Sequence, residues 1–406
     1  MSRVNRRDFV KFMGSTAAGL AAGQWTSFAD AGEIIAREGR GYLERINGNL
    51  VLHVTGGPRE MGWQHGVLLR PHVRDNVHNI LYIAGFVATV AKGVPFIKRI
   101  EKAWGMLHPH IPTKYITEMN ALAAGAGLQA REIHYANVFP ELFHCSGFAL
   151  MDKATKNGEL LHGRLLDYMT GVGLEKNAAV IVYRPDYGHA WVNIGYAGFI
   201  GSVTAMNEKH ISIGEIGGNN NENWNGMPMA ELVRYVMENA ATLDEAVDIM
   251  RRVPHTCQYY YVISDGKSKR AVGVYANATP RVFQTAGPGQ YNRELQPTPV
   301  ADTVIVSSGE HYKKLVERVK RNYGHIDVPV AIAMMKRPVA FESNLQCALF
   351  TPRTLDFWAA NARGRNPACD QPFTHYNLAE LLRQRAPLTR IIQDKRTNGR
   401  RGSHKY

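Results

Sequence analysis

The residues best suited to chemistry in this sequence are one cysteine and a pair of charged residues in the apolar run that follows it. Cys145 begins a short apolar run, and Arg164 and Asp167 lie in the next one. Between the two runs stands Asn157-Gly158, a pair typical of the tight turn of a β-hairpin. Two neighbouring strands would bring a cation and an anion to one thiol, and an adjacent cation lowers the pKa of a thiol. Such an arrangement suits nucleophilic catalysis.

The position of that turn predicts how the two strands align. With the turn near residue 157, Arg164 falls roughly opposite residue 150, and Asp167 falls near residue 147, within reach of Cys145. The same residues also have a purely structural explanation. In that case Cys145 is a buried strand residue, and Arg164 and Asp167 form a salt bridge.

The elements after residue 143 are expected to be strands, then helices, then strands, an order typical of an α+β layered fold. Apolar runs between Gly and Asn turns predict antiparallel strands at 146–151, 159–166, 178–184, 190–195, 202–206 and 210–216. Helices follow at about 228–240 and from Thr242, which forms a capping box with Glu245, to Pro254. The second group of strands is expected at 258–264, 270–276, 280–285, 303–307, 345–350 and 355–360, with a helix at about 310–323.

The part of the chain before residue 143 has a different pattern. Residues 40–56 alternate in polarity and predict a strand. Ala, Leu and Met at helical spacing over 59–141 predict two to four helices, including about 72–92 and 112–127.

The sequence around Cys145 resembles the nucleophile hairpin of a known superfamily, the cysteine N-terminal-nucleophile hydrolases. The similar stretches are Cys-Ser-Gly-Phe-Ala at 145–149 and Asn-Gly-Glu-Leu-Leu-His-Gly-Arg-Leu-Leu-Asp-Tyr at 157–168. The superfamily includes choloylglycine hydrolases, penicillin V acylases and acyl-coenzyme A:6-aminopenicillanic acid acyltransferases. Stretches at 59–66, 116–142, 206–209 and 344–360 resemble the acyltransferase-like branch, in the same order.

The resemblance implies an α+β fold, a four-layer α-β-β-α sandwich of two antiparallel sheets with a helical N-terminal segment. It also implies that the chain cuts itself between His144 and Cys145. The freed α-amino group, with a pKa near 7.7–8.0, would then act as the base for the Cys145 thiol. The thiol would attack a linear amide, and Arg164 and Asp167 would orient the thiol and the amine. A Cys–His dyad is less economical, because no separate histidine is needed.

When the thiol attacks the amide, the carbonyl oxygen becomes an oxyanion that hydrogen-bond donors must stabilise. The residues expected to supply these donors depart from the family pattern. Leu165 stands where the family's Arg-Asn-x-Asp has asparagine, and Gly217 stands where the oxyanion asparagine is expected. The candidates for oxyanion or pocket residues are the backbone amides of Glu215–Gly218, Gly217 among them, and the side chains of Asn219, Asn220, Ser307 and Ser308.

No metal, cofactor or nucleic acid is expected to bind. The four cysteines form no CxxC pair, and His108 and His110 have no carboxylate or cysteine at ligand spacing. No Rossmann or phosphate-loop motif is present. The net charge of +13 is concentrated at the two ends, with eight basic residues against one acidic residue in 383–406. That tail is expected to be solvated, and contact with anionic lipid or polymer is the alternative.

The N-terminus resembles an export signal. Asn-Arg-Arg-Asp-Phe-Val-Lys at 5–11, followed by an Ala/Gly-rich stretch, is similar to a twin-arginine signal. It predicts passage through the twin-arginine translocase to the periplasm or outside, and a basic amphipathic helix is the alternative. We expect residues 1–31 as the signal, 32–144 as the helical N-terminal segment, 145–382 as the nucleophile-bearing core and 383–406 as the basic tail.

The function expected is an exported, self-processing hydrolase of N-acyl amides, with acyl transfer as a related activity. Its partners would be a small N-acyl amide substrate and, after cleavage, the other half of its own chain as a heterodimer. A non-catalytic binding protein on the same fold, with an uncleaved chain, is an alternative. A secreted dipeptidase is another, and a buried acidic group near Cys145 would favour it.

Overall fold

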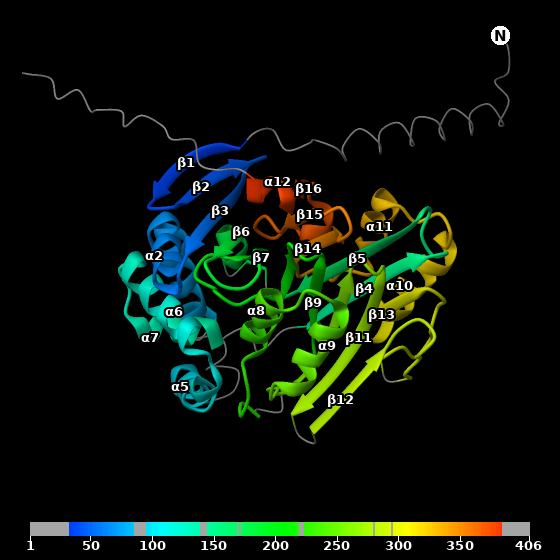
Figure 1. Ribbon diagram of the computed structural model, residues 1–406, viewed down its shortest axis with the longest axis horizontal. Coiled ribbons are helices and arrows are strands. Elements are labelled where there is room, and N and C mark those ends of the chain that lie inside the picture. The colour runs from blue at the N-terminus through cyan, green and yellow to red at the C-terminus, as the bar shows by residue number, and fades with distance from the viewer. Residues whose placement is uncertain are drawn as a thin grey trace, which may run out of the picture.

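The strands of the protein form two sheets, and helices cover the outer face of each (Figure 1). The computed structural model describes residues 32–84, 95–138, 144–168, 170–171, 173–218, 223–278, 281–293 and 295–383. The proposed signal and the basic tail therefore lie outside the described residues, apart from Arg383.

The larger sheet has ten strands in the order β1-β2-β3-β6-β7-β8-β9-β10-β11-β12. All neighbouring strands are antiparallel except β3 and β6, which run parallel. The strands are β1 (Glu33–Glu38), β2 (Gly41–Ile46), β3 (Asn49–Gly56), β6 (Ala178–Pro185), β7 (Trp191–Tyr196), β8 (Thr204–Asn207), β9 (Ile211–Gly217), β10 (Gln258–Asp265), β11 (Arg270–Ala278) and β12 (Arg281–Ala286).

The smaller sheet has six strands in the order β13-β4-β5-β14-β15-β16, and every pairing is antiparallel. The strands are β13 (Thr303–Val306), β4 (His144–Asp152), β5 (Gly158–Asp167), β14 (Asn344–Thr351), β15 (Asp356–Asn361) and β16 (Thr374–Asn377). The hairpin predicted to hold the cysteine, β4–β5, lies in the middle of this sheet.

The two sheets pack face to face. Strands β4 and β5 contact β9 and β10, and β13 contacts β10 and β11. At Gly147 the sheets approach so closely that an added Cβ would lie 2.8 Å from the side chain of Ile216. The apolar side chains between the sheets provide most of the driving force for this packing.

The helices form the outer layers. On the larger sheet, α8 and α9 contact β8, β9 and β10, and on the smaller sheet α10 and α11 contact β13, β5 and β14. The order of layers is α-β-β-α, as the sequence resemblance implies. The helices of the core are α8 (Met229–Asn239), α9 (Leu243–Arg252), α10 (Gly309–Asn322), α11 (Val328–Met335) and α12 (Leu378–Arg383), with short 3-10 turns at Leu174–Asn177 and Ala368–Asp370.

The N-terminal helices form a group beside strand β3, which α2 contacts (Figure 1). They are α2 (Pro58–Leu68), α3 (Arg70–His78), a π-helix (Asn79–Ala84), α5 (Phe96–Leu107), a 3-10 turn (His108–His110), α6 (Thr113–Ala126) and α7 (Ala130–Val138). Helix α6 begins after Pro112 and ends at Gly127, whose φ of 70° is a left-handed cap that favours glycine.

Several predicted boundaries are confirmed. Helix α9 begins as predicted, because Thr242 Oγ1 accepts a hydrogen bond from the Glu245 amide and the Glu245 carboxylate accepts one from the Thr242 amide. The helix expected over 72–92 instead starts at Arg70 and becomes a π-helix, and 85–94 lie outside the described residues. Helix α11 and strand β16 were not predicted.

The description of 32–144 as a helical segment needs correction. Its first part forms β1, β2 and β3, and β3 pairs with β6 over six residue pairs. The N-terminal segment therefore completes the larger sheet, because the hydrogen-bonding edge of β6 is filled by a strand from before the expected cleavage point.

Candidate active site

The β4–β5 hairpin sets the position of the candidate nucleophile. Cys145 lies opposite Leu166, and Arg164 lies opposite Gly147. The predicted register was therefore wrong by three residues. The loop spans 153–157, and the strands shift register between Leu150 and Asp152. The centre of the turn therefore lies before the Asn157-Gly158 pair in the sequence. In the observed register Arg164 lies closer to Cys145 than predicted, two residues from Leu166 on the same strand.

The Cys145 thiol lies beside a buried ion pair formed across the two sheets. Arg164 Nη2 is 3.0 Å from Cys145 Sγ and 3.3 Å from Glu215 Oε2, and Arg164 Nε donates to the Glu215 carbonyl at 3.1 Å. The Arg164 and Glu215 side chains are fully buried. Glu215 Oε2 is 4.0 Å from the sulfur, so cation, anion and thiol form one compact group.

A glycine makes room for the arginine. Gly214 precedes Glu215 on β9, and an added Cβ there would lie 2.7 Å from Arg164 Cγ. Only glycine therefore lets the arginine stem cross the space between the sheets and reach the thiol without displacement.

The thiol is protonated at neutral pH in this continuous chain. Burial raises the pKa of Cys145 to about 12. The positive charge of Arg164 and the backbone amide of Gly217 lower that pKa, whereas the carboxylates of Glu215 and Asp167 raise it. Because burial outweighs the cation, nucleophilic attack requires a base to remove the proton.

Asp167 lies next to the expected cleavage point. It pairs with His144 across the hairpin, so its backbone is adjacent to the peptide bond that precedes Cys145. Its Oδ1 accepts hydrogen bonds from Asn344 Nδ2 at 2.9 Å and from the Phe341 amide at 3.1 Å. Burial raises the pKa of Asp167 in spite of these donors. Its Oδ2 has no hydrogen-bond partner among the described residues.

The expected oxyanion and pocket residues lie in different places. The Gly217 amide is close enough to the Cys145 sulfur to lower its pKa, as a donor beside the reacting thiol would. Ser307 instead bonds to the Ser146 hydroxyl at 2.6 Å, and Ser308 precedes helix α10 as its N-cap. Asn219 and Asn220 lie outside the described residues.

The sequence patterns did not single out the side chains of Glu215 and Asn344 as site residues. Only the backbone amide of Glu215 was considered, although a glutamate in the apolar run 211–217 is a buried charge and therefore a signal. Asn344 was noted only as part of a resembling stretch. Both act through contacts between segments far apart in sequence, which no local pattern reveals.

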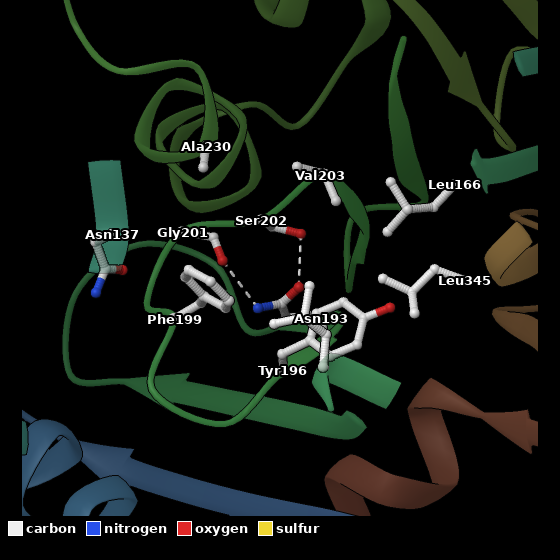
Figure 2. Close-up of a pocket in the computed structure, with 12 residues that line it drawn as sticks. Asn137, Leu166, Asn193, Tyr196, Phe199, Gly201, Ser202, Val203, Ala230 and Leu345 are labelled. Atoms are coloured by element: carbon white, nitrogen blue, oxygen red, sulfur yellow. Dashed lines mark hydrogen bonds between the residues drawn. The ribbon is translucent and has the colours of Figure 1, made fainter. Parts of the chain in front are cut away.

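A small cavity lies next to the hairpin (Figure 2). It measures about 40 Å³ and is bordered by Leu166, the cross-strand neighbour of Cys145, and by Leu345 on the next strand. Its other lining residues are Asn137, Leu174, Asn193, Gly195, Tyr196, Phe199, Gly201, Ser202, Val203 and Ala230. Four of these twelve lining residues lie in the 197–203 loop, which follows β7.

Within the described part of the chain, no three His, Cys, Asp or Glu side chains are arranged to hold a metal ion. None of the helices there combines the length and the apolar character needed to cross a membrane. All four cysteines are buried thiols.

Comparison with known families identifies the group of proteins to which this site belongs. A sequence model of the family described as acyl-coenzyme A:6-aminopenicillanic acid acyl-transferase matches residues 154–350. The match covers Arg164, Asp167, Glu215 and Asn344. The match spans 197 of the 406 residues and supports the cysteine N-terminal-nucleophile hydrolase superfamily. The resemblance seen in the nucleophile hairpin is therefore confirmed.

Individual relatives are distant. A protein of Archaeoglobus fulgidus without a described function is 26% identical over 284 residues, which are 61% of this chain and 46% of that protein. Rat acid ceramidase is 26% identical over 188 residues, 39% of this chain and 46% of the enzyme. The matches thus span about half the length of these relatives. An N-acylethanolamine-hydrolyzing acid amidase ortholog of Caenorhabditis elegans has a TM-score of 0.42 and 16% identity, covering 52% of this chain and 93% of the other.

Proposed function

We propose that this protein is a self-processing amide hydrolase that acts on N-acyl compounds through an acyl-thioester on Cys145. The observation that carries the proposal is the buried Arg164–Glu215 pair, whose guanidinium lies 3.0 Å from the thiol. A buried ion pair costs desolvation and is weak evidence for stability alone, so its position against the only cysteine in the hairpin points to chemistry.

The first step is cleavage of the chain. The Cys145 sulfur attacks the carbonyl carbon of His144, the C–N bond of that peptide breaks, and the amine of Cys145 takes the proton. Water then hydrolyses the thioester to give the carboxylate of His144, a free thiol and a free α-amine. The adjacent Asp167, opposite His144 in the hairpin, would bind the new amine as a carboxylate.

The mature site would repeat this chemistry on a substrate. The α-amine removes the proton from the thiol, the sulfur attacks the amide carbonyl, and the same proton passes to the leaving amine. Water then releases the acyl group as a carboxylic acid. Arg164 holds the sulfur, Glu215 holds Arg164, and the Gly217 amide is the best-placed donor to the developing oxyanion.

The lining of the cavity and the names of the relatives support N-acyl compounds as the substrate class. The cavity beside Leu166 is lined mostly by apolar side chains, which suits an acyl group. The family takes its name from acyl transfer, and acid ceramidase from ceramide, an N-acyl amide. Hydrolysis is favoured over acyl transfer if the protein is exported as its N-terminus suggests, because acyl-coenzyme A is a cytoplasmic donor.

The test is to trap the acyl-enzyme. Wild-type protein mixed with an N-acyl p-nitroanilide and quenched in acid should carry the acyl mass on the peptide that begins with Cys145. A Cys145→Ala variant should carry none and should release no p-nitroaniline. Release without any adduct, or release by the variant, would overturn the proposed mechanism.

A dipeptidase is the second candidate, and one observation favours it. Glu215 is a buried carboxylate 4.0 Å from the thiol, where it would meet a substrate ammonium. That carboxylate is already paired with Arg164, which favours the N-acyl substrate. Comparing the hydrolysis of a dipeptide with that of its N-acetyl derivative decides between the two: a dipeptidase cleaves only the free amine form.

A further inference from the structure

The few polar side chains that line the cavity beside the hairpin are mostly engaged by the protein itself. The Asn193 amide donates to the Gly201 carbonyl at 3.0 Å and accepts from the Ser202 hydroxyl at 2.7 Å. The Asn137 amide donates to the Gly198 carbonyl and accepts from the Ile200 amide. These side chains therefore hold the 197–203 loop in shape, and their hydrogen-bonding capacity toward a ligand is largely used (Figure 2).

One polar group in the wall is left over. The Tyr196 side chain is 7% exposed, and its hydroxyl has no hydrogen-bond partner among the described residues. Figure 2 shows this hydroxyl directed toward the side of the cavity where Leu166 and Leu345 lie. Leu166 is the cross-strand neighbour of Cys145, so the hydroxyl faces the end of the cavity nearest the thiol.

A buried hydroxyl without a partner is costly, and native proteins satisfy most such groups. Burial raises the pKa of Tyr196 well above its usual range, so the phenol stays protonated and acts as a donor. Cys145 and Arg164 are among the groups whose charges act on it, as expected for a side chain close to the reacting sulfur. A hydrogen-bond acceptor on a bound ligand would give the Tyr196 hydroxyl the partner that it lacks.

We propose that the cavity is a subsite for the acyl group and that the Tyr196 hydroxyl donates to an oxygen on the acyl chain. The preferred acyl groups would carry an oxo or hydroxyl group within the first few carbons from the amide carbonyl. The small volume of the cavity, about 40 Å³, fits such a short segment and excludes a bulky ring. This inference rests on the proposed amide hydrolase function.

The test compares matched substrates. The values of kcat/KM for hexanoyl and 3-oxohexanoyl p-nitroanilide are measured with the wild type and with Tyr196→Phe. The wild type should prefer the oxo substrate by roughly tenfold or more, the usual effect of leaving a buried donor unpaired. In Tyr196→Phe the preference should fall to about one, chiefly through slower turnover of the oxo substrate.

A matched control variant removes the hydroxyl of another buried tyrosine. Tyr183 is also buried with a hydroxyl that has no partner among the described residues, but it stacks on Trp191 in the larger sheet, away from the cavity. Tyr183→Phe should keep the wild-type preference. Thermal melting of both variants reports whether they fold.

The outcomes separate the two proposals. If the wild type hydrolyses neither substrate, the amide hydrolase function fails. If it hydrolyses both without preferring the oxo group, the subsite inference fails whatever the variant does. If Tyr196→Phe slows both substrates equally, the hydroxyl acts on the amide carbonyl shared by both, and the inference is again overturned.

Discussion

At the scale of residues, the site combines a thiol that is hard to ionise with groups that hold it in place. The charge of Arg164 alone does not produce a thiolate, because burial and two carboxylates hold the pKa of Cys145 near 12. This explains why the proposed mechanism needs the α-amine, which exists only after cleavage. The uncleaved chain should therefore be a slow catalyst of one reaction, its own cleavage.

The pH dependence of that cleavage follows from the thiol pKa. Below a pKa of about 12 the thiolate fraction grows tenfold for each unit of pH. The first-order rate of cleavage, followed by gel electrophoresis of freshly refolded chain, should rise through pH 7, 8 and 9 without a plateau. Substrate hydrolysis by the mature protein should instead level off near pH 8, where the α-amine becomes neutral. A cleavage rate that is flat above pH 7 would contradict this account.

At the scale of elements, the N-terminal segment supports the substrate cavity. Asn137 in α7 is hydrogen-bonded to Gly198 and Ile200, and His65 in α2 accepts from the Gly198 amide at 3.0 Å. Residues from before the expected cleavage point thus hold the loop that forms one side of the cavity wall. The structure of the pocket depends on contacts across the two halves of the chain.

We expect Asn137→Ala to loosen that loop. Two buried backbone groups, the Gly198 carbonyl and the Ile200 amide, would lose their partner, which costs about 1–3 kcal/mol each. Urea unfolding should show a lower stability, and KM for an acyl substrate should rise more than kcat falls. Asn239→Ala is the control, because Asn239 is exposed and donates to the Tyr235 carbonyl of its own helix. Equal effects of the two changes would argue against a role of the loop.

The elements themselves were largely predictable, and their alignment was not. Most strands of both sheets, although not β1 or β16, follow from apolar runs between turns, and α9 follows from the Thr242–Glu245 capping box. The hairpin register depends on the position of the loop at 153–157 and on a one-residue irregularity between Leu150 and Asp152, which the Asn157-Gly158 pair did not reveal. Glu215 and Tyr196 could not be placed near the site from sequence, because both lie in the larger sheet and the cysteine lies in the smaller one. Helix α11 was missed although Pro329 stands in its first turn, a position that favours a helix start, because its apolar stretch is only eight residues long.

At the scale of the whole molecule, buried contacts join the two chains that cleavage is expected to produce. Glu118 in α6 forms a two-pronged ion pair with Arg234 in α8, at 2.8 Å and 2.6 Å, and Arg234 also bonds to Glu238. The side chains of Glu118 and Arg234 are fully buried. Together with the pairing of β3 and β6, this contact would keep the halves associated after cleavage.

We expect the cleaved chains to elute as one species in size-exclusion chromatography. Glu118→Ala should lower the stability by about 3–5 kcal/mol, because it leaves Arg234 buried with incomplete compensation. The measurement is urea unfolding of the processed protein. Asp248→Ala, which breaks the exposed pair with Arg251, is the control and should change little. Separation of the wild-type chains without denaturant would contradict the proposed heterodimer.

The central claim is that Cys145 becomes an N-terminal nucleophile, and intact mass with N-terminal sequencing tests it most directly. The purified wild type should give two chains, one of which starts at Cys145, whereas Cys145→Ala should remain a single chain through that point. A folded wild-type protein that stays uncut at His144–Cys145 would contradict the account, because its Cys145 would have no free amine to serve as the base.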